Sequence, residues 1–241
     1  MTVSIEIVDD PAQACADLML AACVAHGCTQ IVLAGGSTPK AANEIFARTV
    51  RRRRLSLGDV AFWLGDDRAV GPDDPNSNYG MIRATLLEPL ADLTKPLMHR
   101  IEGELGYAVA ADHYEQCLRH SGVGHFDLLL LGIGPDGHTL SLFAGKPALH
   151  ERGRLVVGVP EAGMEPFVPR VSFTLSAVAL ARHVVFLAEG ADKADALTRA
   201  FGPGAVPDPA IPSSLIPTVA HNVTLLTDAA AAAGLGGAAT S

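Results

Sequence analysis

His138 is the residue whose surroundings point most clearly to chemistry, because it follows a glycine-rich turn after an apolar run. The segment 126–145 reads FDLLLLGIGPDGHTLSLFAG. Its four leucines predict a strand buried on both faces, and the glycines and proline predict a sharp turn after it. Ligands of open α/β sheets bind at the carboxyl ends of strands, where this turn places His138 and Asp136. A polar loop residue is the alternative, but the glycines leave His138 unshielded, so we predict a functional role.

The same segment has the spacing of a dinucleotide-binding loop, Gly132-x-Gly134-x-x-Gly137. The match is weak, because Pro135 interrupts it and no acidic residue ends a second strand about 20 residues later. Glu151 lies near that spacing but precedes the next predicted strand. The sequence therefore gives little support for nucleotide binding.

A second candidate site is the glycine pair in the segment 33–39, which reads LAGGSTP. Paired glycines, a Ser/Thr cap and a proline at the first helical position build a helix N-terminus whose N–H groups are free. Such an end favours an anion, although a plain capped turn would have the same composition. The spacing to a Gly-Lys-Ser/Thr is absent, so this is not a Walker loop.

A third candidate is Gly65-Asp66-Asp67-Arg68, which ends a strand predicted at Val60–Leu64. Two carboxylates and a guanidinium at the carboxyl end of a strand suggest a functional role. A surface turn has a similar composition, and the residues alone favour neither interpretation. The loop 71–78 that follows is long enough for a flap or lid.

The composition limits the class of protein. The chain has 241 residues, which fits one α/β domain with enough core to fold independently. No apolar run reaches the ~18 residues of a membrane span, and the N-terminus MTVSIEIVDD is unlike a secretory signal. The net charge of −8 argues against nucleic acid or anionic lipid as a partner, and an anionic small molecule would need a locally positive pocket.

The four cysteines lack the paired spacing of metal ligands. They are Cys15, Cys23, Cys28 and Cys117, and three of them lie in or just after one predicted helix. Reduced, buried thiols in a cytoplasmic protein explain them better than disulfides do.

Strands alternate with helices along the chain. Strands are predicted at 4–8, 29–33, 60–64, 97–101, 128–131, 155–159, 170–175, 184–188 and 223–226. Helices are predicted at 11–26 (ended by Gly27), 39–50, 77–90, 107–120 and 193–201, with the start of another at 139–143. Arg51–Arg54 is interpreted as a solvated face, and 229–241 as a frayed tail. The alternation predicts a single domain, 1–241, with a doubly wound, mainly parallel, Rossmann-like sheet and helices on both faces.

Four segments occur in a consistent order that resembles a known family. They are LAGGSTP, WLGDDR with the SNYG that follows, FDLLLLGIGPDGHTLSLF, and RVSFTLSA with EGADKADAL downstream. In this order they resemble the 6-phosphogluconolactonase family, within the wider group that includes glucosamine-6-phosphate deaminase. The likeness runs from about Ile31 to Leu197 and extends weakly to Ile211–Leu215.

The resemblance implies roles for the residues that match the family's motifs. It assigns phosphate binding to Gly36, Ser37, Thr38, Arg170 and Lys193. It places Asp66 and Arg68 near the sugar ring and makes His138 the general base. A dianionic phosphate in a protein of this net charge needs charged donors as well as amides, which supports the two basic residues.

The activity implied is hydrolysis of 6-phospho-D-glucono-1,5-lactone to 6-phosphogluconate, a step of the oxidative pentose phosphate pathway, without metal or organic cofactor. His138 would take a proton from water, and Arg68 would stabilise the oxyanion. Protonated His138 would then return a proton to the ring oxygen. Either Asp136 or Asp66 would assist the imidazole.

Two other functions compete with this hypothesis: a deaminase–isomerase and a non-catalytic sugar-phosphate sensor. The deaminase pattern has a glutamate five residues after the histidine, where this chain has Phe143, which can neither accept a proton nor pair with an imidazolium. No DNA-binding module is evident, and His138 is retained, which disfavours a sensor. We expect a small-molecule substrate and no nucleic-acid, membrane or obligatory protein partner.

Overall fold

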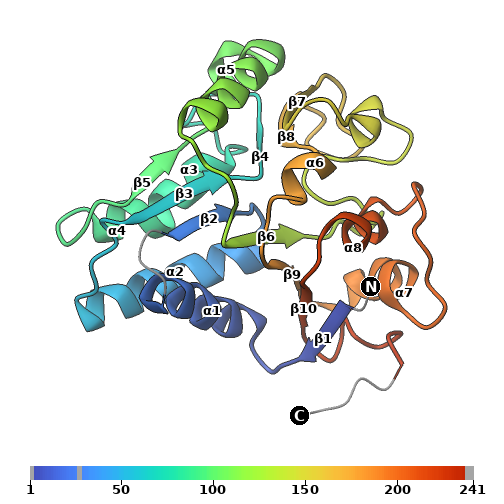
Figure 1. Ribbon diagram of the computed structural model, residues 1–241. Helices are drawn as coiled ribbons and strands as arrows, with labels where there is room; N and C mark the ends of the chain where they lie inside the picture. The colour runs from blue at the N-terminus through green and yellow to red at the C-terminus, as the bar shows by residue number, and fades with distance from the viewer. Residues whose placement is uncertain (1–2, 26–28, 237–241) are drawn as a thin grey trace.

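A parallel sheet forms the centre of the computed structural model, which describes residues 3–25 and 29–236 (Figure 1). Within these residues its seven strands lie in the order β1-β10-β9-β6-β2-β3-β5, and all neighbours are parallel. Each lies where the sequence predicts a strand. Their bounds are β1 Val3–Ile7, β2 Thr29–Leu33, β3 Val60–Leu64, β5 Leu97–His99, β6 Leu128–Gly132, β9 Val184–Ala188 and β10 Val223–Thr227.

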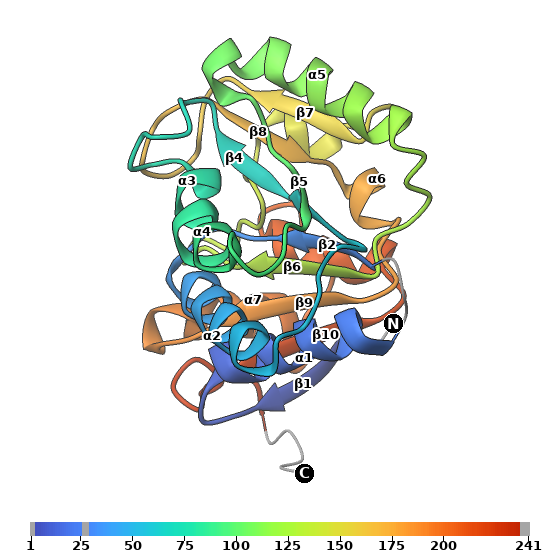
Figure 2. The ribbon, with the colours of Figure 1, turned by 90° about the vertical axis from the view of Figure 1, so that its left-hand side faces the viewer.

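Helices cover both faces of this sheet. Helices α1 (Pro11–Ala25) and α2 (Ser37–Arg53) pack against each other. Figures 1 and 2 show them on one side of the sheet, with α7 (Ala194–Phe201) and α8 (Ile216–Val219) on the other. All residues of β3, β9 and β10 are buried, which is why their sequences are continuous apolar runs. The doubly wound, mainly parallel fold is therefore confirmed.

The other helical segments are short, apart from α5. They are α3 Asn78–Ile82, the π-helical turn η1 Arg83–Leu87, α4 Glu88–Leu90, α5 Tyr107–His120, α6 Leu175–Val178, and the 3₁₀ turns η2 Gly103–Leu105, η3 Pro147–His150, η4 Ala191–Lys193 and η5 Pro212–Leu215. Ser77 caps α3, since its hydroxyl oxygen accepts the N–H of Gly80. In the part of the chain that the structure describes, no helix combines the length and apolarity needed to cross a membrane.

Three short strands form a second, antiparallel sheet that the sequence analysis did not predict. Its order is β4 (Asp66–Arg68), β8 (Arg170–Phe173) and β7 (Val156–Val159). The apolar patterns predicted β7 and β8 as strands but assigned them to the central sheet, because a pattern reports burial and not pairing. Gly65 joins the two sheets: its N–H donates to the carbonyl of Leu33, and its own carbonyl accepts from Phe173.

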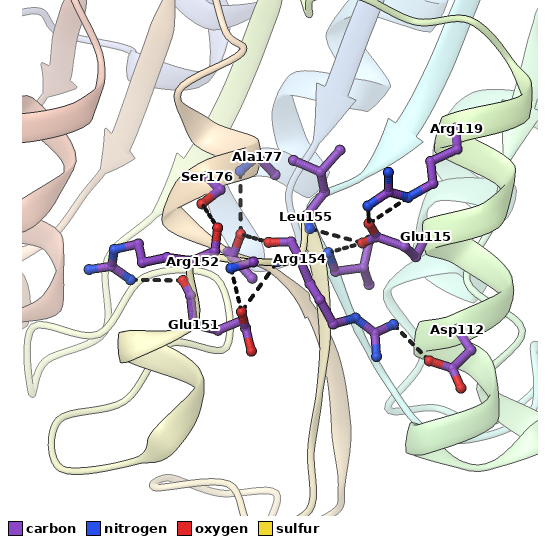
Figure 3. Close-up of polar contacts among 12 residues, drawn as sticks. Asp112, Glu115, Arg119, Glu151, Arg152, Arg154, Leu155, Ser176 and Ala177 are labelled. Atoms are coloured by element: carbon purple, nitrogen blue, oxygen red, sulfur yellow. Dashed lines mark hydrogen bonds and ion pairs between the residues drawn. The ribbon is translucent and has the colours of Figure 1, made fainter.

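Helix α5 is fixed to this second sheet through the buried carboxylate of Glu115 (Figure 3). Its Oε2 accepts the backbone N–H groups of Leu155 at 2.9 Å and Val156 at 2.7 Å. Its Oε1 accepts two bonds from the guanidinium of Arg119, at 3.0 and 2.6 Å. One side chain therefore joins the middle of α5 to the beginning of β7.

The prediction of a helix at 139–143 is wrong. These residues form a tight turn in which the N–H of Leu142 donates to the carbonyl of Thr139 at 3.0 Å. Leu140 has a φ of 54°, in the left-handed region, which a right-handed helix cannot contain. The hydroxyls of Thr139 and Ser141 form bonds to Gly132 and Asp66, and these contacts fix the turn.

The expectation of a frayed tail is also wrong for residues 229–236. Ala231 and Leu235 are buried, and the carboxylate of Asp228 accepts the N–H of Ala231 at 2.8 Å. Residues 237–241 lie outside the described residues, as do His26 and Gly27, where the end of the first helix is predicted.

Three of the cysteines, Cys15, Cys23 and Cys117, are free thiols, as expected. Burial raises the pKa of Cys15 and of Cys23 to about 12, so both remain protonated at neutral pH. Cys28 lies outside the described residues.

Candidate active site

A pocket of about 300 Å³ lies at the carboxyl ends of β2, β6 and β9, where the second sheet meets the first. Eight of the nine residues singled out from the sequence line it: Gly36, Ser37, Thr38, Asp66, Arg68, His138, Arg170 and Lys193. The ninth, Asp136, is in direct contact with His138. Other lining residues were not foreseen, among them Asn78, Met164, Glu165 and Glu189.

The glycine-rich turn holds His138 against Asp136. The Nδ1 of His138 lies 2.6 Å from Oδ1 of Asp136, and the backbone N–H of His138 donates to the same oxygen at 3.1 Å. A Cβ on Gly134 would lie 2.1 Å from Nδ1 of His138, so this position requires glycine. A carboxylate at Nδ1 favours the tautomer that carries its proton there, and Nε2 is then free to accept one.

The contact between the two side chains also affects Asp136. Burial of Asp136 opposes its ionisation, but the hydrogen bonds from His138 and the charge of the imidazole outweigh burial. The pKa of Asp136 is therefore held below its ordinary value. Asp136 is consequently a carboxylate at neutral pH and acts as an acceptor toward the imidazole.

The segment Ile211–Leu215 packs against the glycine-rich turn that precedes His138. The N–H of Ser213 donates to the carbonyl of Gly137 at 3.0 Å. Gly137 has a φ of 87°, and a Cβ there would lie 2.8 Å from Ile211. The late segment that carries the weak end of the family resemblance thus packs directly against the turn that carries His138.

Asp66 has a partner other than His138. Its Oδ2 accepts the hydroxyl of Ser141 at 2.6 Å, and the hydroxyl of Thr139 donates to the carbonyl of Gly132 at 2.8 Å. These two bonds hold the tight turn between β4 and the end of β6.

Asp67, which the sequence analysis left without a role, is a buried anchor for the segment that follows the loop 71–78. Its carboxylate accepts the backbone N–H of Asn78 at 2.7 Å and of Tyr79 at 3.0 Å, and the hydroxyl of Ser77 at 3.3 Å. Burial raises the pKa of Asp67 to about 6, although the N–H donors act in the opposite direction.

Asn78 orients Arg68 and was missed by sequence reasoning. Nη1 of Arg68 donates to Oδ1 of Asn78 at 2.9 Å and to the carbonyl of Asn76 at 2.7 Å. The Nδ2 of Asn78 donates to the carbonyl of Asp66 at 3.0 Å. A Cβ on Gly35 would lie 2.1 Å from Oδ1 of Asn78, so the glycine pair also makes room for this side chain. The motif SNYG, which follows WLGDDR in the sequence, was the signal that could have identified Asn78 as a residue of the site.

Arg68 and Arg170 are directly opposite each other on β4 and β8. Like charges at directly opposed positions of a sheet repel each other, and an anion between them relieves that repulsion. Burial, the largest cause, lowers the pKa of Arg170 from its ordinary value. Among the described residues, the Nε atoms of both arginines are buried without a hydrogen-bond partner.

The N-terminus of α2 and Lys193 also line the pocket. Gly36 precedes the first residue of α2 with a φ of 111°, and the first N–H groups of a helix have no acceptor within it. Nζ of Lys193 lies 3.0 Å from Oδ2 of Asp192. The hydroxyl of Thr38 donates to Oε2 of Glu189 at 3.4 Å, so a carboxylate borders this part of the pocket.

Comparison with known proteins gives a consistent result. The family described as glucosamine-6-phosphate isomerases/6-phosphogluconolactonase matches residues 4–225. A protein of Nostoc sp. named 6-phosphogluconolactonase is 38% identical over 212 residues, which cover 85% of this chain and 84% of that protein. The crystal structure of 6-phosphogluconolactonase from Leishmania guyanensis matches with a TM-score of 0.81 at 27% identity, covering 98% of this chain and 100% of the other. A monomeric glucosamine-6-phosphate deaminase matches with a TM-score of 0.82 at 20% identity, covering 97% and 99%, and this likeness shows the fold alone.

Proposed function

Because this chain belongs to the glucosamine-6-phosphate isomerase/6-phosphogluconolactonase family, we propose that it hydrolyses 6-phospho-D-glucono-1,5-lactone to 6-phosphogluconate. The observation that carries the proposal is the imidazole of His138, bonded through Nδ1 to Asp136, in a pocket that also holds two arginines and a helix N-terminus. A base beside anion-binding groups suits a phosphorylated lactone, whose hydrolysis needs a base and an oxyanion stabiliser.

The phosphate of the substrate binds to the N-terminus of α2 at Gly36, Ser37 and Thr38, with Lys193 and Arg170 as charged donors. The free amides and the dipole of a 17-residue helix support this assignment, since both favour an anion. A partly buried lysine at the same pocket supplies charge that amides alone lack.

Hydrolysis starts when Nε2 of His138 takes a proton from water and the water oxygen bonds to C1 of the lactone. Negative charge moves to the carbonyl oxygen, and the guanidinium of Arg68 stabilises it. The bond from C1 to the ring oxygen then breaks, and the imidazolium returns its proton to that oxygen, which leaves as a hydroxyl group. Asp136 keeps the imidazole oriented and stabilises its charged form throughout.

The nature of residue 143 favours this reaction over deamination. Phe143 is buried, and its ring lies 4.5 Å from the ring of His138. The resemblance places a glutamate at this position in the deaminases, where it pairs with the histidine for ring opening. A phenyl ring can neither accept nor donate that proton.

An assay of acid release tests the proposal. The purified protein should accelerate acid release from freshly made 6-phosphogluconolactone above the spontaneous rate, below neutral pH, where hydroxide attack is slow. It should release no ammonia from glucosamine 6-phosphate. His138→Asn should lower kcat by about 10²- to 10⁴-fold while 6-phosphogluconate still binds. Ammonia release without lactone hydrolysis would overturn the assignment, and an unchanged kcat in His138→Asn would overturn the role of the base.

A further inference from the structure

Phe143 contacts two functional side chains at once. Its ring centroid lies 4.5 Å from that of His138 at an interplanar angle of 37°, and Cζ of Arg170 lies over the same ring at 5.3 Å. Phe143 is 1% exposed, so its position is determined by packing and not by solvent. The proposed base and one of the proposed phosphate ligands therefore share a single aromatic neighbour.

The imidazole of His138 needs this neighbour because Asp136 restrains it in one direction only. The bond from Nδ1 to Oδ1 of Asp136 fixes one edge of the ring. An imidazole held at one edge can still tilt about that bond, and such a tilt moves Nε2 at the opposite edge. The phenyl ring of Phe143 packs against the imidazole and restricts the tilt.

Arg170 is held in a similar way, by the ring and by the loop that precedes its strand. Its Nη2 donates to the carbonyls of Met164 at 3.0 Å and Pro166 at 3.1 Å. The same loop closes over Phe143 at Gly163, where a Cβ would lie 2.8–3.0 Å from three atoms of the phenyl side chain. The loop, the guanidinium and the phenyl ring thus form one packed unit.

We propose that Phe143 is a positioning residue for the reaction: its buried ring fixes the plane of the His138 imidazole relative to Arg170. This inference rests on the proposed lactone hydrolysis. A displacement of a reacting group by about 1 Å costs on the order of 10²-fold in rate, so restriction of the imidazole tilt has a direct effect on kcat. The aromatic face also attracts cations, and both Arg170 and the imidazolium formed during the reaction are cations.

The test compares Phe143→Leu with Phe173→Leu. Phe173 is a matched control, because it is a fully buried phenylalanine on β8 that stacks on Phe126 and Tyr114 and does not line the pocket. Phe143→Leu should lower kcat by about 10- to 100-fold with little change in KM. Phe173→Leu should lower stability to a similar extent and leave kcat near that of the wild type. Equal losses of kcat in the two variants, or no loss in Phe143→Leu, would overturn the proposal.

A second variant keeps the phenylalanine and crowds it. In Gly163→Ala a methyl group would lie 2.8–3.0 Å from atoms of Phe143, so either the ring or the loop around residue 163 must shift. The kcat should fall, and NOEs between the ring protons of His138 and the protons of Gly134 should change in intensity in both Gly163→Ala and Phe143→Leu, because NOEs report the orientation of the imidazole and are not changed by the loss of a ring current. NOEs that keep their wild-type intensity in both folded variants would contradict positioning. A wild-type protein without lactonase activity would instead refute the proposed function, and the NOE comparison would still decide whether Phe143 positions His138.

Discussion

Of the two carboxylates at the site, Asp136 is the one whose contact suits assistance to His138. Its Oδ1 lies 2.6 Å from Nδ1 of the imidazole, whereas Asp66 accepts the hydroxyl of Ser141 at the same distance. In the proposed mechanism Asp136 therefore stabilises the imidazolium, and Asp66 holds the turn that follows His138. The two acids have separate tasks although both belong to one site.

Lys193 gives the cleaner test of phosphate recognition, because Arg170 also holds the loop that precedes β8. Lys193→Ala should raise KM for the phosphorylated lactone about tenfold, the loss of one charge-assisted hydrogen bond, with little change in kcat. Steady-state kinetics measure both constants. Lys95→Ala removes an exposed lysine outside the pocket and should change neither. An equal loss on unphosphorylated gluconolactone would mean that Lys193 does not recognise the phosphate.

At the scale of elements, the attachment of α5 to β7 depends on Glu115. Glu115→Ala leaves the N–H groups of Leu155 and Val156 without their acceptor, and each unsatisfied buried donor costs about 1–3 kcal/mol. The free energy of unfolding in urea should therefore fall by about 2–6 kcal/mol. Asp112→Ala is the control: Asp112 lies on the same helix as Glu115 and forms an exposed ion pair with Arg154 (Figure 3), and its loss should cost less than about 1 kcal/mol. Equal losses in the two variants would exclude this role for Glu115.

The elements of the site could be predicted from the sequence where their signals are local. The leucines of β6 and the glycines after them indicate a buried strand and a turn within a few residues. The pairing of β4 with β8 has no such signal, because Arg68 and Arg170 are far apart in the chain and meet only in the second sheet. The contact of Asn78 with Arg68 was missed for a different reason, because the SNYG motif marked the segment but not which side chain Asn78 would contact. Sequence patterns and the family resemblance together predicted eight of the lining residues, but not others such as Asn78 and Glu189, and not which partners the side chains have there.

At the scale of the whole molecule, three cationic side chains gather at one pocket of a negatively charged chain. The chain has a net charge of −8, and Arg68, Arg170 and Lys193 line the pocket together with the acidic residues Asp66, Glu165 and Glu189. A negative molecule repels an anionic ligand at long range, and salt screens this repulsion beyond about 10 Å. Affinity for an anion must therefore come from these close donors and from the N-terminus of α2.

The same pocket region makes the stability of the whole fold depend on pH through Asp67. Burial, the largest cause, raises the pKa of Asp67 from its ordinary value of 3.8 to about 6. Between these values the folded protein retains a proton that the unfolded chain has released. The contribution of Asp67 to the free energy of unfolding therefore decreases as the pH rises through this window, and it stays low above pH about 6.

Asp67→Asn should remove this dependence, because the amide does not titrate. The wild type should lose about 2 kcal/mol relative to the variant between pH values of about 4.5 and 7, which follows from the two pKa values. Urea unfolding across this range measures the difference at each pH. The amide group of asparagine has one acceptor oxygen fewer than the carboxylate, which accepts bonds from Ser77 and Tyr79. The lost acceptor lowers the stability of the variant by an amount that is the same at every pH. A difference that stays constant with pH for Asp67→Asn would mean that the pKa of this carboxyl group is the same in the folded and unfolded protein, and Asp67 would then not couple stability to pH.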